Sequence, residues 1–270
     1  MPGQHTLENM LNFLKSFFRH PEMPLISSGK TDIGQVRKNN EDNFGIDTNS
    51  NLFIVADGMG GHNAGEVASR LSVETIRNHF SKKTLNSIRG NSQEIRHAMI
   101  SSFQFANDMV MKMAVENENL HGMGCTLVLG LVDSDALHTC HVGDARCYIA
   151  SGNGLQQLTT DHTTLVELQK EFGSDHDFLE TLPTRNVVTR VIGYPFPEPP
   201  EYNSARISEN DRILFCSDGL WSMVDDQMIY NTLISSETPE DAVTQLLKYA
   251  NDAGGTDNIT GVAVFVRQPV

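Results

Sequence analysis

Cysteine is scarce in this sequence, and long apolar runs are absent. The four cysteines form no CxxC pair, and several stand in apolar stretches, which is typical of buried free thiols in a reducing compartment. They are Cys125, Cys140, Cys147 and Cys216. No run of about 18 apolar residues occurs, so we expect no transmembrane helix. The first residues lack the pattern of a signal peptide, and we therefore expect a cytoplasmic protein.

Positive charge is also in short supply. Lys and Arg number 20 against 34 Asp and Glu, which gives a formal net charge of −14. Such a chain has no general electrostatic attraction for nucleic acid or an anionic membrane. The net charge does not exclude a local basic pocket. A hydrophobic content of 39% excludes bulk disorder, and 270 residues suit one large domain or two small ones. The excess acid is either a solvated surface or a set of carboxylates that holds cations.

Residues 1–26 differ from the rest and are predicted to form an N-terminal extension. Apolar side chains recur there at steps of three and four, which predicts a short amphipathic helix. This helix either packs on the domain surface or binds a partner or a membrane surface. Only Lys15 and Arg19 supply positive charge, which weakens the membrane interpretation. The apolar positions are Leu7, Met10, Leu11, Leu14, Phe17 and Phe18.

Apolar, β-branched runs with little alternation predict strands that are covered on both faces. They span 52–56, 125–132, 136–142, 145–150, 211–216 and 259–266. Amphipathic helices are predicted over 64–80, 93–116 and 239–252. Two helices come together before a run of strands, so the order indicates sheets covered by helices rather than a doubly wound parallel sheet. Residues 160–201 form one long irregular segment, which is typical of a functional lid or flap.

Acidic residues mark the ends of several predicted strands. One Asp-Gly is usually only a turn, but its recurrence indicates that several strand ends converge and bring their carboxylates together in one site. Their repulsion favours bound cations, and ligands that are all oxygens select Mg²⁺ or Mn²⁺. Two such ions about 4 Å apart can bind a bridging water and clamp a phosphoryl group. The acids are Asp57, Asp144, Asp218 and Asp257, together with the pair Glu41 and Asp42 that follows Arg37.

Eight stretches then occur in an order that matches one known family. They are VRKNNEDNFG, FIVADGMGGHNAGEVAS, GCTLVLGLV, CHVGDARCYI, DHTTLVEL, NVVTRVIG, LFCSDGLWSMV and GGTDNITGVAV. Through them the chain resembles the bacterial branch of the metal-dependent Ser/Thr protein phosphatases, the protein phosphatase 2C family. The resemblance implies an α+β fold, a four-layer α-β-β-α sandwich of two antiparallel sheets. It implies a phosphatase domain over 27–267 that contains a flap at 161–201.

The resemblance also implies which residues hold the metals. Asp57 matches the carboxylate that bridges two Mn²⁺ or Mg²⁺ ions, and Gly58 matches a backbone carbonyl ligand of the second ion. Asp218 and Asp257 match ligands of the first ion. Three further acids match outer positions, with Glu41 and Asp42 facing the second ion and Asp144 joining Asp218 around a weaker third one.

The substrate side of the site is implied by Arg37, which matches the arginine that grips the substrate phosphate. Eukaryotic members carry a His directly after the Asp-Gly, where this chain has Met59. His62 lies three residues further on and either helps to bind substrate or donate a proton, or is an exposed loop residue. His162, in the motif DHTT, is interpreted as a turn cap, and His121 is expected to have no catalytic role.

The expected activity is hydrolysis of phosphoserine and phosphothreonine in proteins by a water or hydroxide that bridges the two ions. The resemblance implies that the enzyme counteracts a Ser/Thr kinase, with the kinase or its targets as partners, and we expect a monomer. One alternative is a non-catalytic binding module with the same fold, although the acids Asp57, Asp218 and Asp257 are all present. Another is a different two-metal phosphoesterase such as a nuclease, against which the charge of −14 argues.

Overall fold

The chain folds into two antiparallel β-sheets that pack face to face. The computed structural model describes residues 23–60, 64–173 and 177–267. One sheet has the order β1-β10-β9-β6-β7 and the other the order β2-β3-β4-β5-β8. The first contains β1 (Leu25–Asp32), β6 (Arg146–Ser151), β7 (Gly154–Gln157), β9 (Arg212–Cys216) and β10 (Ile259–Val266). The second contains β2 (Asn43–Asp47), β3 (Leu52–Met59), β4 (Gly124–Asp133), β5 (Ala136–Val142) and β8 (Glu201–Arg206).

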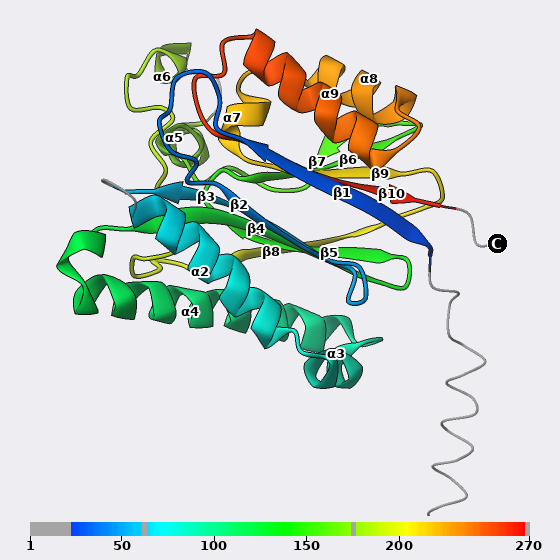
Figure 1. Ribbon diagram of the computed structural model, residues 1–270, viewed down its shortest axis with the longest axis horizontal. Coiled ribbons are helices and arrows are strands. Elements are labelled where there is room, and N and C mark those ends of the chain that lie inside the picture. Colours follow the sequence, from blue (N-terminus) through cyan, green and yellow to red (C-terminus); the bar gives the residue numbers. More distant parts are fainter. Residues whose placement is uncertain (1–22, 61–63, 174–176, 268–270) are drawn as a thin grey trace, which may run out of the picture.

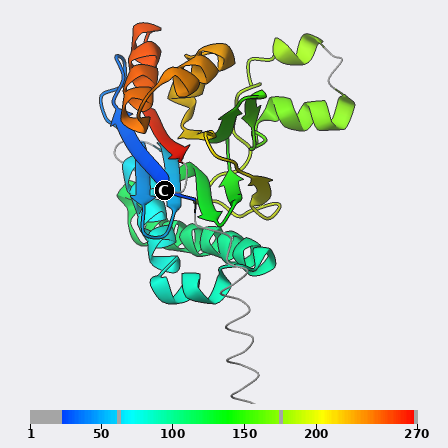
Figure 2. The same ribbon diagram turned by 90° about the vertical axis from the view of Figure 1, so that its right-hand side faces the viewer.

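Helices cover the outer face of each sheet, so the molecule has four layers (Figure 1). The second sheet is covered by α2 (Ala64–His79), α3 (Lys82–Ile88) and α4 (Ser92–Glu116), followed by the short η1 (Glu118–Leu120). The first sheet is covered by α7 (Asp218–Trp221), α8 (Asp226–Ser235) and α9 (Pro239–Asp252). Residues 161–201, the segment predicted as a flap and referred to by that name below, carry α5 (Thr164–Phe172) and α6 (Asp177–Glu180), which project to one side of the sheets (Figure 2). The predicted α-β-β-α sandwich is confirmed.

The strands lack apolar–polar alternation because each sheet has two buried faces. In β3, Phe53 belongs to the apolar layer between the sheets, whereas its neighbour Ile54 packs beneath the helices. Phe53 stacks on Phe215 of the opposite sheet, with 6.0 Å between ring centroids. Gly130 makes room for this pair, since a Cβ there would lie 2.2 Å from the Phe215 ring. Burial of both faces is what fixes the two sheets against each other.

The six predicted strands and three predicted helices are all present within a few residues of their predicted bounds. The four cysteines are buried and free, as predicted. β1 begins at Leu25, inside the segment predicted as an extension, and pairs with β10. The predicted amphipathic helix falls on residues 1–22, outside the described residues, and stays a prediction. In the part of the chain that the structure describes, no helix is long and apolar enough to cross a membrane.

Candidate metal centre

The predicted acids converge from four elements that the sequence separates widely. Asp57 stands near the end of β3, Asp144 follows β5, Asp218 begins α7 directly after β9, and Asp257 precedes β10. The carboxyls of Asp57 and Asp218 are close enough to share a proton. The charges of Asp42 and Asp144 also act on Asp57. Both sheets therefore contribute carboxylates to one site.

This cluster of carboxyls is electrostatically unfavourable in the absence of cations. Burial raises the pKa of Asp57 well above its ordinary value, and the charges of its acidic neighbours raise it further. Burial, reinforced by the charge of Asp218, raises the pKa of both Asp42 and Asp144 to about 7. The pKa of Asp218 is raised by burial and by the charge of Asp257. Positive charge at this place would stabilise all four.

Three carboxylate oxygens in the cluster are buried and have no hydrogen-bond partner among the residues that the structure describes. They are Oε1 of Glu41, Oδ1 of Asp42 and Oδ1 of Asp218. Burial also raises the pKa of Glu41. A buried oxygen without a partner is costly unless it meets a donor, a water or an ion. These oxygens, all of the hard type, fit the coordination preferences of Mg²⁺ and Mn²⁺.

Gly58 is the point at which a strand, a loop and a helix meet. Its N–H donates to the carbonyl of Glu41 over 3.2 Å. A Cβ at position 58 would lie 2.3 Å from the carbonyl oxygen of Gly65, at the start of α2, and 2.4 Å from that of Glu41. Only glycine allows this approach, which brings the acidic loop and the start of α2 against Asp57.

Arg37 lies at the rim of the acidic cluster, with about half of its side chain exposed. Its Nη2 donates to Oδ2 of Asp257 over 2.5 Å. This hydrogen bond raises the pKa of the guanidinium, and the charges of Asp57 and Asp218 add to the effect. An exposed guanidinium beside the carboxylates is available to an anion that approaches them.

Asn258 organises the loop that carries the acidic pair, and it was not predicted. Its Nδ2 donates to the carbonyls of Ile33 and Asn39 over 3.0 and 2.9 Å. Its Oδ1 accepts from the N–H of Glu41 over 2.8 Å, while its own N–H donates to Asp257. One buried amide thus ties the loop between β1 and β2 to the start of β10. The sequence signal was an asparagine directly after an acid at a strand end.

Ser217 plays a similar part beside Asp218 and was also missed. Its hydroxyl donates to Oδ2 of Asp42 over 2.7 Å and accepts from the N–H of Thr260 over 3.0 Å. Asp42 is therefore oriented through one oxygen and leaves the other without a partner.

The predicted residue His62 lies outside the described residues, and its role stays a prediction. Met59, at the position where eukaryotic members carry a His, ends β3 and is 40% exposed. It offers a flexible apolar side chain at the edge of the site.

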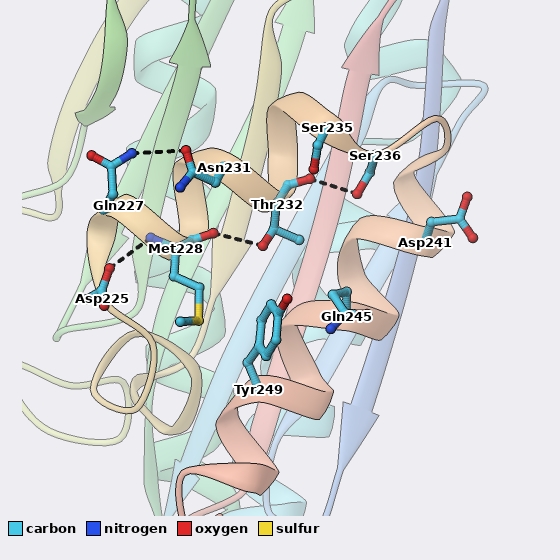
Figure 3. A pocket seen from close by; sticks show the side chains of 10 residues that line it. All are labelled: Asp225, Gln227, Met228, Asn231, Thr232, Ser235, Ser236, Asp241, Gln245 and Tyr249. Atoms are coloured by element: carbon cyan, nitrogen blue, oxygen red, sulfur yellow. Dashed lines mark hydrogen bonds between the residues drawn. The ribbon is translucent and has the colours of Figure 1, made fainter.

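A polar groove of about 670 Å³ lies elsewhere, between α8 and α9 (Figure 3). None of the predicted site residues lines it. Its walls are Asp225, Gln227, Met228, Asn231, Thr232, Ser235, Ser236, Asp241, Gln245 and Tyr249. We assign the chemistry to the acidic cluster rather than to this groove.

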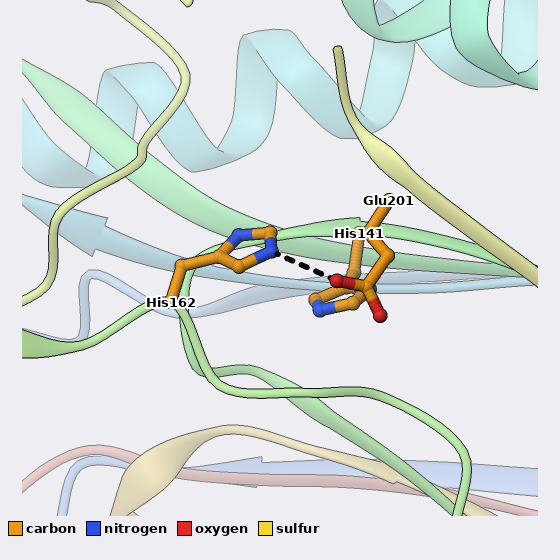
Figure 4. A group of neighbouring side chains, drawn as sticks. All are labelled: His141, His162 and Glu201. Carbon is orange, nitrogen blue, oxygen red and sulfur yellow. Dashed lines mark ion pairs between the residues drawn. The ribbon is translucent and has the colours of Figure 1, made fainter. Parts of the chain in front are cut away.

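A second group of ionisable side chains was not predicted. His141 of β5 lies together with His162 and Glu201, which stand near the two ends of the segment 161–201, with potential ligand atoms within 4.8 Å of one another (Figure 4). His162 Nε2 lies 3.5 Å from Oε2 of Glu201, and its ring stacks on that of His141. Burial lowers the pKa of His141 to about 4, and contact with His162 lowers that of Glu201 to about 2.

Comparison with known proteins identifies relatives that match most of the chain. The family model of protein phosphatase 2C matches residues 25–259. Protein phosphatase PhpP of Streptococcus pneumoniae is 31% identical over 242 residues, which are 88% of this chain and 96% of that protein. Serine/threonine phosphatase stp of Listeria monocytogenes is 32% identical over 238 residues, which are 87% of this chain and 93% of that protein.

Solved structures agree with these relatives. The serine/threonine phosphatase of S. agalactiae superposes with a TM-score of 0.82 at 31% identity and covers 90% of this chain and 100% of its own. The catalytic domain of the phosphatase PstP, solved with two manganese ions, gives a TM-score of 0.77 at 29% identity and covers 90% of this chain and 99% of its own. The chain belongs to the protein phosphatase 2C family and is a protein-serine/threonine phosphatase.

Proposed function

We propose that this phosphatase hydrolyses phosphoserine and phosphothreonine with a water activated by two Mn²⁺ or Mg²⁺ ions at the acidic cluster. The observation that carries the proposal is the set of three buried carboxylate oxygens without partners, among carboxyls whose pKa values are raised. The manganese ions of the related PstP support the choice of metal. Reversal of a Ser/Thr kinase, a cytoplasmic location and a monomeric state belong to the same proposal.

The residues divide the work as the family resemblance implies. Asp57 would be shared by both ions, Asp218 and Asp257 would hold the first, and the Gly58 carbonyl would face the second. Glu41 and Asp42 would complete the second position, and Asp144 with Asp218 would bind a weaker third ion. Bound in this way, the ions supply an activated water and offset the charge that develops on the phosphate oxygens. Their charge also removes the repulsion among the carboxylates.

Arg37 would bind the substrate phosphate, because it is the exposed cation at the rim of the cluster. Arg37→Ala is expected to raise KM for a phosphopeptide by about 10- to 100-fold, with kcat within about threefold, because a guanidinium that binds phosphate contributes to substrate affinity. Steady-state kinetics at saturating Mn²⁺ measures the two constants. Lys38→Ala, which removes an exposed cation one residue away, is the matched control and should change neither. A fall in kcat alone would contradict phosphate binding by Arg37.

The metal-free protein is expected to lose stability as the pH rises. Asp42 and Asp144 keep a proton up to about pH 7 in the folded chain but only up to about pH 4 when unfolded. The folded state therefore binds more protons between these values, so the contribution of these two carboxyls to stability is full below about pH 4 and declines up to about pH 7. Mn²⁺ should cancel most of the decline, with a melting temperature about 10 °C above that in EDTA at pH 8. Parallel melting curves in EDTA and in Mn²⁺ would contradict metal binding by these carboxyls.

The decisive experiment for the reaction is a phosphopeptide panel assayed with Mn²⁺, Mg²⁺ and EDTA. Release of phosphate from phosphoserine and phosphothreonine peptides should require a divalent ion and stop in EDTA. Parallel assays on single-stranded and double-stranded DNA should show no cleavage, in agreement with the net charge of −14. Hydrolysis that persists in EDTA would refute the proposed role of the ions.

A further inference from the structure

His162 makes two hydrogen bonds to the turn that carries Asp144. The backbone N–H of His162 donates to the carbonyl of Gly143 over 3.0 Å. In return, the N–H of Gly143 donates to Nδ1 of His162 over 3.1 Å. Gly143 has a φ of +92° and a Cβ there would lie 2.4 Å from Thr126, so this residue has little freedom to move. Both backbone polar groups of the residue before Asp144 are thus held by one histidine.

On the other side of the same turn, Asp161 binds the side chain of Arg146. Its carboxylate accepts from Nε and Nη2 of Arg146 over 2.9 and 2.6 Å, which is a bidentate pair. The guanidinium of Arg146 also stacks 3.4 Å over the ring of Trp221. Trp221 donates its Nε1–H to the carbonyl of Asp144 over 2.9 Å. His162 therefore holds the backbone of Gly143 directly, and Asp161 acts on the carbonyl of Asp144 indirectly, through the Arg146 guanidinium and Trp221.

The contacts of His141, His162 and Glu201 suit a structural support for the turn around Asp144 better than they suit a metal site. Because Nδ1 of His162 accepts from Gly143, the neutral ring carries its proton on Nε2 and offers no lone pair towards Glu201. The rings of His141 and His162 are nearly parallel, at 14°, so their in-plane lone pairs do not converge on one point (Figure 4). His141 instead bonds through Nε2 to the carbonyl of Thr160 over 2.8 Å. The cluster supports the segment that contains Asp161 and His162.

The segment that contains Asp161 and His162 also pairs with residues 187–189 in the later part of the flap. The N–H of Thr189 donates to the carbonyl of His162 over 2.8 Å, and the N–H of Thr164 donates to the carbonyl of Val187 over 2.9 Å. Thr163 and Val188 form an isolated β-bridge between them. A displacement of residues 187–189 would therefore pull on the segment that holds Asp144.

We propose that Asp161 and His162 are positioning residues that fix the backbone around Asp144, place its carboxylate for a weak third cation and connect it mechanically to the rest of the flap. This inference rests on the proposed function, since it needs cations at the acidic cluster. The side chains of Asp161 and His162 bind Arg146 and Gly143 rather than any of the carboxylates proposed to hold the two tight ions. We therefore expect them to act on cation binding through Asp144.

The test is a Mn²⁺ titration followed by electron paramagnetic resonance, which counts bound ions without any need for activity. The wild-type chain should bind two ions tightly and one weakly, and Asp144→Asn should lose the weak one. His162→Leu and Asp161→Asn should weaken the third ion by at least tenfold and change the two tight ions by less than twofold. His162→Asn, whose side-chain oxygen can accept from Gly143, should recover most of the affinity. Hydrogen exchange over residues 183–192 should rise in His162→Leu.

Glu201→Gln is the matched control, because it alters the buried contact at His162 Nε2 and leaves the bond to Gly143 intact. It should bind the third ion as wild type does. Equal weakening of all ions, an effect of Glu201→Gln as large as that of His162→Leu, or a wild-type chain without an ion that depends on Asp144 would overturn the proposal. If His162→Leu does not fold, Asp161→Asn gives the answer alone. Absence of phosphopeptide hydrolysis by a wild-type chain with its ions bound would refute the proposed function, while the ion count would still decide the role of Asp161 and His162.

Discussion

Asp57→Asn is expected to reduce phosphopeptide hydrolysis by at least about 1,000-fold, because it removes the charge that both ions would share. The same change should stabilise the metal-free protein. Asp57 is half-buried, and its burial together with the charges of Asp42, Asp218 and Asp144 opposes its ionisation. Asparagine keeps the shape and removes that repulsion, so the melting temperature in EDTA at pH 8 should rise by about 5 °C. Loss of activity combined with a gain in stability identifies a metal ligand rather than a structural acid.

Asp108→Asn is the matched control for this substitution. Asp108 is exposed on α4 and accepts a hydrogen bond from Gln104, which asparagine can also accept. Neither activity nor the melting temperature in EDTA should change. Calorimetric titration with Mn²⁺ completes the comparison, since only Asp57→Asn should lose tight binding. Near-normal activity with unchanged Mn²⁺ affinity would show that Asp57 does not hold the ions.

The strands that the sequence revealed are those buried on both faces. β4 and β10 are buried along almost their whole length, so they read as unbroken apolar runs. The unpredicted strands β1, β2, β7 and β8 are the outer strands of the two sheets. β1 (LISSGKTD) and β8 (EYNSAR) carry polar residues because one side of an edge strand meets solvent or a loop. Composition alone does not separate such a strand from a loop.

The gathering of the acids could be predicted from the sequence, because an acid at a strand end has few structural reasons to recur. Asp57, Asp144, Asp218 and Asp257 were singled out on that ground, and their roles as metal ligands stay a proposal. Asn258 was missed because its partners, the carbonyls of Ile33 and Asn39, are 225 and 219 residues away along the chain. Its role depends on the path of a loop, and no local pattern encodes that path. Residues such as Asn258, which orient the loop that carries the acidic side chains, are therefore the hardest to predict from the sequence.

His162 shows the same limit. The motif DHTT favoured a turn cap, and the turn is real, since Thr163 caps α5. The ring itself, however, reaches Gly143 on the other side of the site. The contact became visible only when the flap segment and the β5–β6 turn were seen together.

Gly58→Ala is expected to cost both activity and stability, because position 58 has no space for a methyl group. The atoms that a Cβ would meet are backbone carbonyl oxygens of Gly65 and Glu41, at 2.3 and 2.4 Å, and neither can rotate away as a side chain could. Relief requires α2 or the acidic loop to move away from β3. Overpacking of this kind costs about 1–3 kcal/mol. The same movement separates Glu41 from Asp57, so we expect hydrolysis to fall by about 100-fold at saturating Mn²⁺.

Gly152→Ala separates this effect from a general penalty for replacing glycine. No heavy atom lies within 4 Å of a Cβ at position 152, in the turn between β6 and β7, so both activity and stability should stay at wild-type values. Thermal melts with and without Mn²⁺ add a sharper readout, because a site held apart by the new methyl group should gain less from the ions than wild type does. An unchanged Mn²⁺-dependent gain in melting temperature, even with lower overall stability, would mean that the loop and β3 can separate without losing the ions. In that case the close approach at Gly58 would serve folding alone, and the carbonyl of Gly58 would have to be removed from the proposed ligands.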